Sequence, residues 1–267
     1  LGLDDRVCDH LPEFGVRGKE PIAIRHLLTH TGGFRWIDTL WPDATWDEII
    51  ARICAAKVER GWAPGEKAGY HMFTSWYILG ELVRRIDARP FSQYVREEIF
   101  EPLGMLDSWI GMSETSYEAY GERIGQLADT ENPRSGDAWP VHRYSTREGA
   151  VDCIPGGNGL GPMRELGRLY EAMLGKGALD GVRLLDPPAA EAMVARHRVG
   201  MHDQTFGIVI YWGLGFIIDS VNYGRHCSPR TFGHGGGQSS VAFADPEHQL
   251  AVALVMNGLP GPAVHYK

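Results

Sequence analysis

The 267-residue sequence lacks several features that would place it in common classes of protein. It has no cluster of basic residues, and 26 Lys and Arg against 34 Asp and Glu give a formal charge of −8. Such an acidic balance disfavours nucleic acid or an anionic membrane surface as a partner. No apolar stretch is long enough to span a bilayer, because the best candidate, residues 206–218, is short and interrupted by Gly213 and Gly215.

Cysteines are also few and scattered, with no C-x-x-C pair: Cys8, Cys54, Cys153 and Cys227. This spacing matches neither a zinc site nor a disulfide framework, so we expect free thiols in a reducing compartment, which favours a cytoplasmic location. A disulfide between distant cysteines stays open. No pattern indicates a metal or an organic cofactor. The oligomeric state stays open, as does any targeting segment outside this sequence.

What is present is an order of helices and long loops followed by strands. Residues 1–20 show no periodicity and predict a loop, and residues 104–161 predict loops that wall a cleft. The spacing of apolar residues predicts helices over 21–28, 45–54, 70–86, 91–100 and 166–174. Three β-rich runs, 206–218, 231–244 and 249–256, predict neighbouring antiparallel strands. We expect a mostly helical lobe with cleft loops over 1–205 and sheet strands over 206–267.

The first informative motif is Tyr70-His71-Met72, after Pro64-Gly65 and before the most regular predicted helix. A lone tyrosine here is usually a core or surface aromatic. The surrounding string, however, resembles the Tyr-x-Asn segment of the serine β-lactamase/penicillin-binding-protein superfamily. The resemblance implies that the Tyr70 hydroxyl is a general base or proton relay, a role that needs nearby positive charge. Met72 replaces the Asn, and because a thioether cannot bind a substrate amide, esters are favoured over β-lactams.

The second motif is the glycine-rich run Phe232-Gly233-His234-Gly235-Gly236-Gly237. Successive glycines weaken a strand and usually mark close approach of a ligand or another backbone. The run resembles the family's Lys-Thr-Gly motif in its His-x-Gly variant; the alternative is a hairpin strand with an incidental histidine. The resemblance implies that the N–H of Gly237 binds the oxyanion and that His234, Gly235 and Gly236 shape the substrate site. With Lys and Thr replaced, anionic β-lactams should bind less well.

A third segment, His26-Leu27-Leu28-Thr29-His30-Thr31-Gly32, resembles the family's His-Leu-Leu-x-His-Thr-Ser-Gly. His26 and His30 are four residues apart and could share a metal on one helical face. No Glu follows His26 and no third ligand is evident, so a zinc protease is a poor reading. We interpret both histidines as scaffold.

The family's nucleophile motif, Ser-x-x-Lys, is absent, because no lysine in the sequence has a serine three residues before it. Cys54-Ala55-Ala56-Lys57 has the spacing, but Cys54 falls on an apolar stripe and is expected in the core. No Gly-x-Ser-x-Gly elbow of the α/β-hydrolases occurs either. In the family the motif lies shortly before the segment that matches Leu3-Asp4-Asp5. We therefore interpret the sequence as a fragment without the N-terminal strands and the catalytic helix.

Taken together, the resemblance implies an α+β fold of the β-lactamase/D,D-peptidase kind, an antiparallel sheet flanked by helices beside a mostly helical lobe. It implies a serine hydrolase acting on an ester or amide bond of a small molecule through an acyl-serine, with esterase or transesterase chemistry. Two alternatives stay open: a β-lactamase, D,D-peptidase or D-aminopeptidase, and a catalytically inactive binding module. We expect this chain alone to be inactive and marginally stable, with an unpaired apolar sheet edge.

Overall fold

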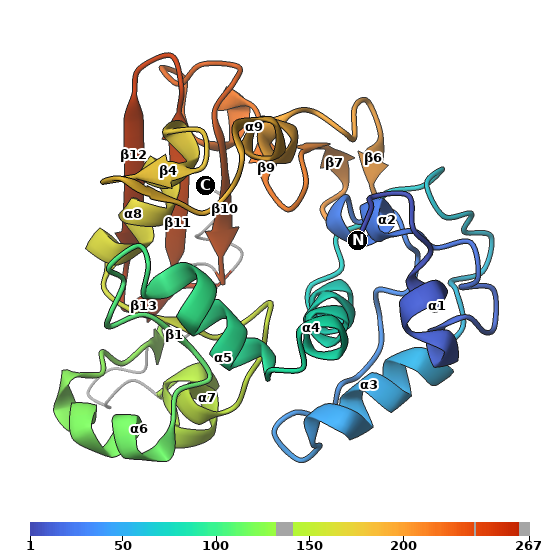
Figure 1. Cartoon of the computed structure of the whole chain (residues 1–267), viewed down its shortest axis with the longest axis horizontal. Helices are drawn as coiled ribbons and strands as arrows, with labels where there is room; N and C mark the ends of the chain where they lie inside the picture. The colour runs from blue at the N-terminus through green and yellow to red at the C-terminus, as the bar shows by residue number, and fades with distance from the viewer. Residues whose placement is uncertain (132–140, 238, 262–267) are drawn as a thin grey trace.

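The computed structural model describes residues 1–131, 141–237 and 239–261 and forms a mixed assembly of helices and sheet (Figure 1). Its α-helices are α1 (Val7–His10), α2 (Ile24–Leu28), α3 (Trp46–Ala55), α4 (Thr74–Asp87), α5 (Phe91–Val95), α6 (Glu114–Tyr120), α7 (Arg147–Val151), α8 (Met163–Leu174) and α9 (Pro187–Val194). Shorter 3₁₀ or π turns are η1 (Pro12–Phe14), η2 (Arg96–Phe100), η3 (Gly121–Arg123), η4 (Arg143–Ser145) and η5 (Ser220–Asn222).

The main sheet has five antiparallel strands in the order β12-β11-β10-β9-β8. These strands are β8 (Tyr211–Trp212), β9 (Ile217–Ile218), β10 (Phe232–Gly236), β11 (Ser240–Asp245) and β12 (Leu250–Val255). Short pairs lie outside it: β1 (Trp109–Ile110) with β3 (Gly159–Leu160), β2 (Ala128–Asp129) with β13 (Gly258–Leu259), β4 (Ala178–Leu179) with β5 (Val182–Arg183), and β6 (His202–Asp203) with β7 (Ile208–Val209). The predicted antiparallel sheet flanked by helices is confirmed.

Around the N-terminal helices, one apolar core joins α1, α2, α3 and α4. Helix α3 begins as predicted, because the Thr45 hydroxyl accepts from the Glu48 N–H and the Glu48 carboxylate accepts from the Thr45 N–H. Ile49, Ile50 and Ile53 of its apolar stripe are buried in this core. The local signals in this part of the sequence therefore agree with its packing.

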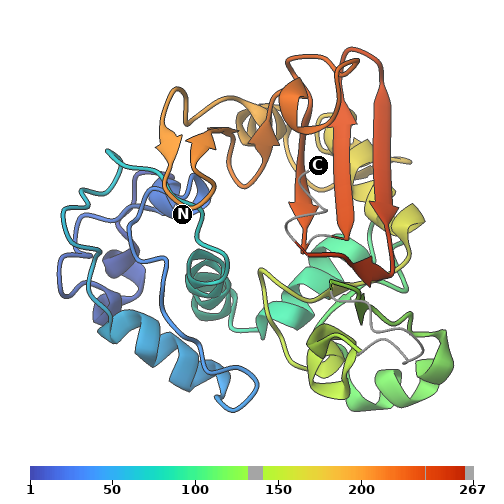
Figure 2. The same ribbon diagram turned by 180° about the vertical axis from the view of Figure 1, so that it is seen from behind.

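A second core lies between the sheet and the helices α8 and α9. Tyr170 and Met173 of α8 pack against Ala242 and Ala244 of β11. In Figure 1, α8 crosses one face of the strands, and Figure 2 shows the opposite face of β10, β11 and β12 from behind. Helices α8 and α9, which precede residue 205 in the sequence, therefore pack against the sheet. The predicted division of the chain at residue 205 rests on the types of element on either side and stays a prediction.

Three local predictions are wrong. Residues 104–161 are not all loop, because α6 and α7 form there. Residues 1–20 are not all loop, since α1 and η1 form there and bury Val7, Leu11 and Phe14. The helix expected from Tyr70 begins four residues later, at Thr74. Hydrogen bonds to a distant segment hold Tyr70 in a non-helical position, as described below, and no local pattern carries that information.

One edge strand of the described sheet is exposed. Strand β12 is the last strand of the described sheet, and its side chains Leu250, Leu254 and Val255 are 46%, 49% and 44% exposed. This agrees with the apolar edge expected from the sequence, whereas marginal stability stays a prediction. Within the described ranges, no helix is long and apolar enough to cross a membrane.

Candidate active site

Tyr70 lies in the extended segment that leads into α4, and both of its peptide groups are bound by residues around β6 and β7. Its N–H donates to Asp203 Oδ1 at 3.1 Å. Its carbonyl oxygen accepts from the Thr205 hydroxyl at 3.0 Å. These two hydrogen bonds span 133 and 135 residues of sequence, so they fix the position of Tyr70 through the tertiary fold.

Aromatic side chains from four different segments surround the Tyr70 ring. It stacks on Trp212 at a centroid distance of 5.7 Å and on Phe206 at 5.2 Å, and it meets His30 edge-on at 4.7 Å. The ring of His234, from β10, lies 5.5 Å away. The structure therefore brings together Tyr70 and His234, two of the residues predicted from separate motifs.

The surroundings of Tyr70 keep its hydroxyl protonated. Burial raises the pKa of Tyr70 to about 12, and the negative charge of Asp203 acts in the same direction. Only a hydrogen bond with Trp76 lowers this pKa. A tyrosine base needs a cation at its oxygen, so the described surroundings hold a neutral phenol at physiological pH.

The glycines of β10 and Gly237, the residue after it, lie in different structural surroundings. A side chain at Gly233 would place its Cβ 2.3 Å from the carbonyl oxygen of Ala242, so close pairing of β10 with β11 requires glycine there. At Gly235 the nearest atom to such a Cβ is 3.8 Å away, and at Gly237 nothing lies within 4 Å. Gly237 also has a φ of +40°, which favours glycine. Gly235 and Gly237 thus face open space, whereas a Cβ at Gly236 would lie 2.5 Å from the Ser240 hydroxyl oxygen.

His234 is partly buried next to these glycines. Its Nδ1 contacts the carbonyl oxygen of Gly235, and its Nε2 is buried without a hydrogen-bond partner among the described residues. Burial lowers the pKa of His234, so the ring is neutral at physiological pH. A neutral imidazole cannot replace the lysine charge of the Lys-Thr-Gly motif as a partner for a substrate carboxylate.

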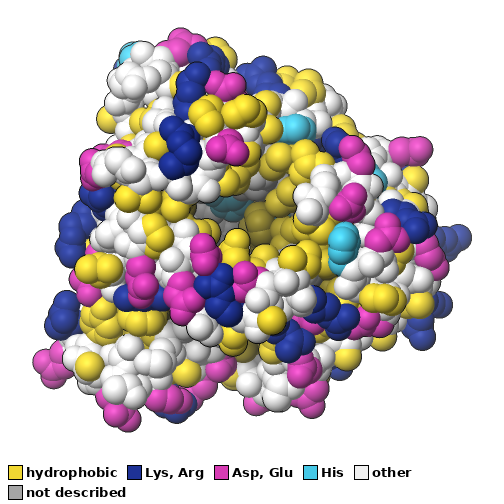
Figure 3. Space-filling model, in the orientation of Figure 1, with side chains coloured by type: hydrophobic (Ala, Val, Ile, Leu, Met, Phe, Trp, Pro, Cys, Tyr) yellow, Lys and Arg dark blue, Asp and Glu magenta, His cyan; other side chains and the backbone are white. Residues whose placement is uncertain are grey.

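The segment after Tyr70 and the end of β10 line the same cavity, which has a volume of about 1170 Å³. Met72, which is 48% exposed, lines it together with Gly236 and Gly237. Figure 3 shows that this face of the molecule is hollowed near its centre, where hydrophobic and histidine side chains line the opening. Of the predicted substrate-binding residues, Met72 and Gly236 therefore share a cavity with the predicted oxyanion donor, Gly237.

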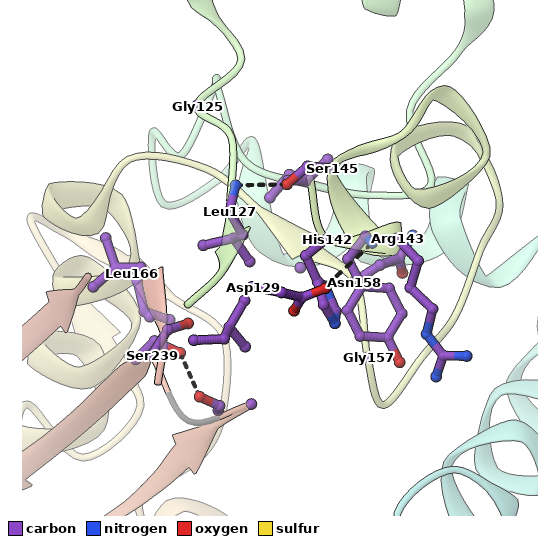
Figure 4. Close-up of a pocket in the computed structure, with 18 of the residues that line it drawn as sticks. Gly125, Leu127, Asp129, His142, Arg143, Ser145, Gly157, Asn158, Leu166 and Ser239 are labelled. Atoms are coloured by element: carbon purple, nitrogen blue, oxygen red, sulfur yellow. Dashed lines mark hydrogen bonds between the residues drawn. The ribbon is translucent and has the colours of Figure 1, made fainter. Parts of the chain in front are cut away.

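Polar residues from the segment expected to be loop complete the cavity wall. Figure 4 shows Leu166 of α8 beside Ser239 on one side, with His142, Arg143 and Asn158 across from them. The Asn158 side chain binds the backbone, because its Oδ1 accepts from the N–H of Ile154 at 2.9 Å. The sequence pattern did not single out His142, Arg143 or Asn158, because they lie in a region without periodicity.

The two histidines of the third segment have structural partners. His26 Nδ1 accepts from the N–H of Ala23 at the start of α2. His30 is fully buried, and its Nδ1 accepts from the N–H of His71 at 3.2 Å. Within the described ranges, no group of three or more His, Cys, Asp or Glu side chains is arranged to hold a metal ion. Both side chains therefore have structural partners, and His30 also contacts the Tyr70 ring.

His71, between Tyr70 and Met72, is a second fully buried histidine. Its Nε2 accepts from the N–H groups of Gly33 at 3.0 Å and Phe34 at 3.1 Å. Burial lowers the pKa of His71 to about 3. Because the ring must accept two hydrogen bonds, it is held neutral and ties the Tyr70 segment to the loop after α2.

Comparison with known proteins identifies the family. The description that matches is Beta-lactamase, and the match covers residues 1–267. The chain belongs to the Beta-lactamase family.

Three members or neighbours of the Beta-lactamase family illustrate its range. The esterase/beta-lactamase LipL of Mycobacterium tuberculosis is 24% identical over 97% of this chain and 64% of its own length. A penicillin-binding protein homolog from Caulobacter crescentus is 32% identical, with a TM-score of 0.79 over 97% of this chain and 71% of that one. A family VIII carboxylesterase is 26% identical, with a TM-score of 0.82 and the same two coverages. The chain thus spans less than two thirds of the length of LipL.

Within this Beta-lactamase-family chain, the remaining nucleophile candidate is excluded by its surroundings. Cys54 is 4% exposed in the helical core, and burial raises the pKa of its thiol to about 11. A thiol with such a pKa is a poor nucleophile at neutral pH. The expectation that Cys54 is a core residue is confirmed.

Proposed function

We propose that this chain provides the tyrosine and glycine sides of a serine-hydrolase site with esterase or transesterase chemistry. The observation that carries the proposal is the contact between the Tyr70 and His234 rings. Tyr70 and His234 are not among the residues that line the cavity, but Met72 and Gly236, two positions further along each segment, are. Membership in the Beta-lactamase family and the esterase names of two similar proteins support it. The hydroxyl nucleophile would come from a Ser-x-x-Lys segment, which these 267 residues do not contain.

In the proposed reaction, the serine oxygen attacks the carbonyl carbon of an ester and gives a tetrahedral intermediate. The C–O bond to the alcohol then breaks, and an acyl-serine remains until water or a second alcohol takes the acyl group. Tyr70 would pass the serine proton to the departing alcohol once the lysine ammonium lies near its oxygen. The N–H of Gly237 would donate to the oxyanion, a contribution of about 10²–10³ in rate.

Neutral esters are the proposed substrates. The thioether of Met72 cannot donate a hydrogen bond to a substrate amide and accepts one only weakly. Buried His234 is neutral, so the third motif presents no fixed positive charge for a carboxylate. Both features favour an uncharged acyl ester over a β-lactam or a peptide with a free carboxylate.

The test joins the chain to a segment carrying Ser-x-x-Lys and measures hydrolysis of p-nitrophenyl butyrate and of nitrocefin. We expect the fusion to cleave the ester and to be labelled at its serine by a fluorophosphonate, whereas the chain alone is not labelled. A Tyr70→Phe fusion should lose at least about 10²-fold in rate, because general acid–base catalysis contributes that much.

Other outcomes would overturn the proposal. Cleavage of nitrocefin without ester turnover favours a β-lactamase, and a stable penicillin adduct favours a D,D-peptidase. A folded fusion whose serine is not labelled favours the inactive binding module.

A further inference from the structure

A buried ion pair between Arg198 and Asp203 lies next to the Tyr70 backbone and belongs to none of the three sequence motifs. Arg198 Nη2 and Asp203 Oδ2 are 2.9 Å apart, and their side chains are 1% and 0% exposed. A pair so deeply buried loses most of its attraction to the cost of removing two charges from water. Stabilisation of the fold is therefore a weak explanation for this buried ion pair. The hydrogen bonds that its two side chains make with other segments explain it better.

One carboxylate oxygen of Asp203 accepts hydrogen bonds from three backbone N–H groups. Oδ1 accepts from the N–H of Tyr70 at 3.1 Å, of Thr205 at 2.9 Å and of Phe206 at 3.1 Å. The Thr205 hydroxyl then reaches back to the Tyr70 carbonyl oxygen, and the Phe206 ring stacks on the Tyr70 ring. The turn between β6 and β7 thus holds the backbone and one face of the Tyr70 ring through a single carboxylate.

Arg198 connects the same carboxylate to a second ring that stacks on the tyrosine. Its Nη1 donates to the carbonyl oxygen of Thr29 at the end of α2, at 3.0 Å. Its backbone pairs with Trp212, and its guanidinium lies 5.2 Å from the centre of the Trp212 ring, which stacks on Tyr70. Three segments that meet at Tyr70 are therefore joined through one arginine and one aspartate.

We propose that Asp203 and Arg198 are positioning residues that fix the orientation of the Tyr70 phenol toward His234. The importance of this orientation for catalysis rests on the proposed function of Tyr70. A carboxylate suits the task because it can bind three N–H groups and a guanidinium at once, which no neutral side chain can do.

The experiment uses the whole chain with 3-fluorotyrosine at position 70, followed by fluorine NMR, and the exchange rate of the Tyr70 amide. The main variant is Arg198→Met with Asp203→Leu, which replaces the buried pair by apolar side chains and removes the acceptor of the three N–H groups. We expect the fluorine resonance to move toward that of free fluorotyrosine and the amide to exchange about tenfold faster. Asp180→Asn, which removes an exposed pair with Arg168, should change neither signal.

A second label separates positioning from a general loss of structure. Fluorotyrosine at Tyr77, buried in the helical core, should keep its resonance in the main variant. An unchanged Tyr70 resonance in a folded main variant would overturn the proposal. If that variant does not fold, Thr205→Val decides: it removes only the bonds of one hydroxyl, to Tyr70 and Arg35, and must move the Tyr70 resonance. None of these readouts needs turnover, so failure of the proposed function would leave them interpretable.

Discussion

The tyrosine side and the glycine side of the candidate site are built in opposite ways. Tyr70 is held by residues far away in sequence, through two backbone hydrogen bonds and rings from four segments. Gly235 and Gly237 belong to a hairpin whose strands pair with near neighbours, and no atom lies closer than 3.8 Å to the positions where their side chains would begin.

This difference separates the two tasks of such a site. A proton-transfer group must be held in one orientation, because small displacements of a reacting group reduce catalysis strongly. A backbone N–H that binds a developing charge needs instead an unobstructed approach, which glycines in a hairpin provide. Substitutions should therefore be costly around Tyr70 and tolerated at Gly235, whereas the positive φ of Gly237 still favours glycine there.

The largest effect should come from Trp212, which is fully buried and contacts His30, Tyr70 and His234. Trp212→Ala removes a ring from between these groups and should lower the free energy of unfolding by about 3–5 kcal/mol. Urea unfolding followed by circular dichroism measures the change. Trp36→Ala is the matched control, because Trp36 is 67% exposed and its removal should cost less than about 0.5 kcal/mol. Equal losses in the two variants would contradict the importance of the tyrosine side.

Gly233 and Gly235 test the glycine side with the same substitution at two positions of one strand. Gly233→Ala forces a Cβ against the carbonyl oxygen of Ala242 and the backbone of Phe243, and should cost about 3 kcal/mol. Gly235→Ala meets nothing closer than 3.8 Å and should change stability by less than about 1 kcal/mol. Thermal unfolding of both proteins gives the comparison, and a larger loss at Gly235 would show that the strand is packed differently.

Acid should weaken the tyrosine side through His71. Its pKa is about 3 in the folded chain and has its ordinary value of 6.5 when unfolded, so between these values the unfolded state binds more protons. Stability is therefore lost as the pH falls below 6.5, by about 2 kcal/mol at pH 5 for this group. Burial lowers the pKa of His30 as well, which adds a loss in the same direction.

Urea unfolding at pH 8 and pH 5 measures this dependence. In His71→Gln, an amide oxygen can still accept from Gly33 and Phe34, and the pH dependence should shrink by the contribution of His71. His202→Gln, at an exposed histidine, is the control and should keep the full dependence. A dependence of the same size in His71→Gln and the unaltered chain would place the acid sensitivity elsewhere.

Local sequence patterns predicted the elements on both sides but only part of the site. The capping box of α3, the helix α8 and the strands β10 to β12 follow from the spacing of residues that are close together in the sequence. The pairing of Tyr70 with His234 was expected only through the family resemblance. Asp203, Arg198 and Trp212 were missed because the segments that they contact at Tyr70 and Thr29 lie more than a hundred residues away, and a buried ion pair has no periodicity. The same distant contacts explain why α4 begins after Tyr70 and not at it.

The smallest effect on stability should come from the tyrosine hydroxyl itself. Tyr70→Phe keeps the ring between Trp212 and Phe206 and loses only the hydrogen bond with Trp76, so the free energy of unfolding should change by less than about 1 kcal/mol. Thermal unfolding of the two proteins checks this. A loss as large as that of Trp212→Ala would mean that the hydroxyl is a structural group. A small loss would mean that the surrounding rings and the buried ion pair hold the side chain in place, and that its oxygen is left for chemistry.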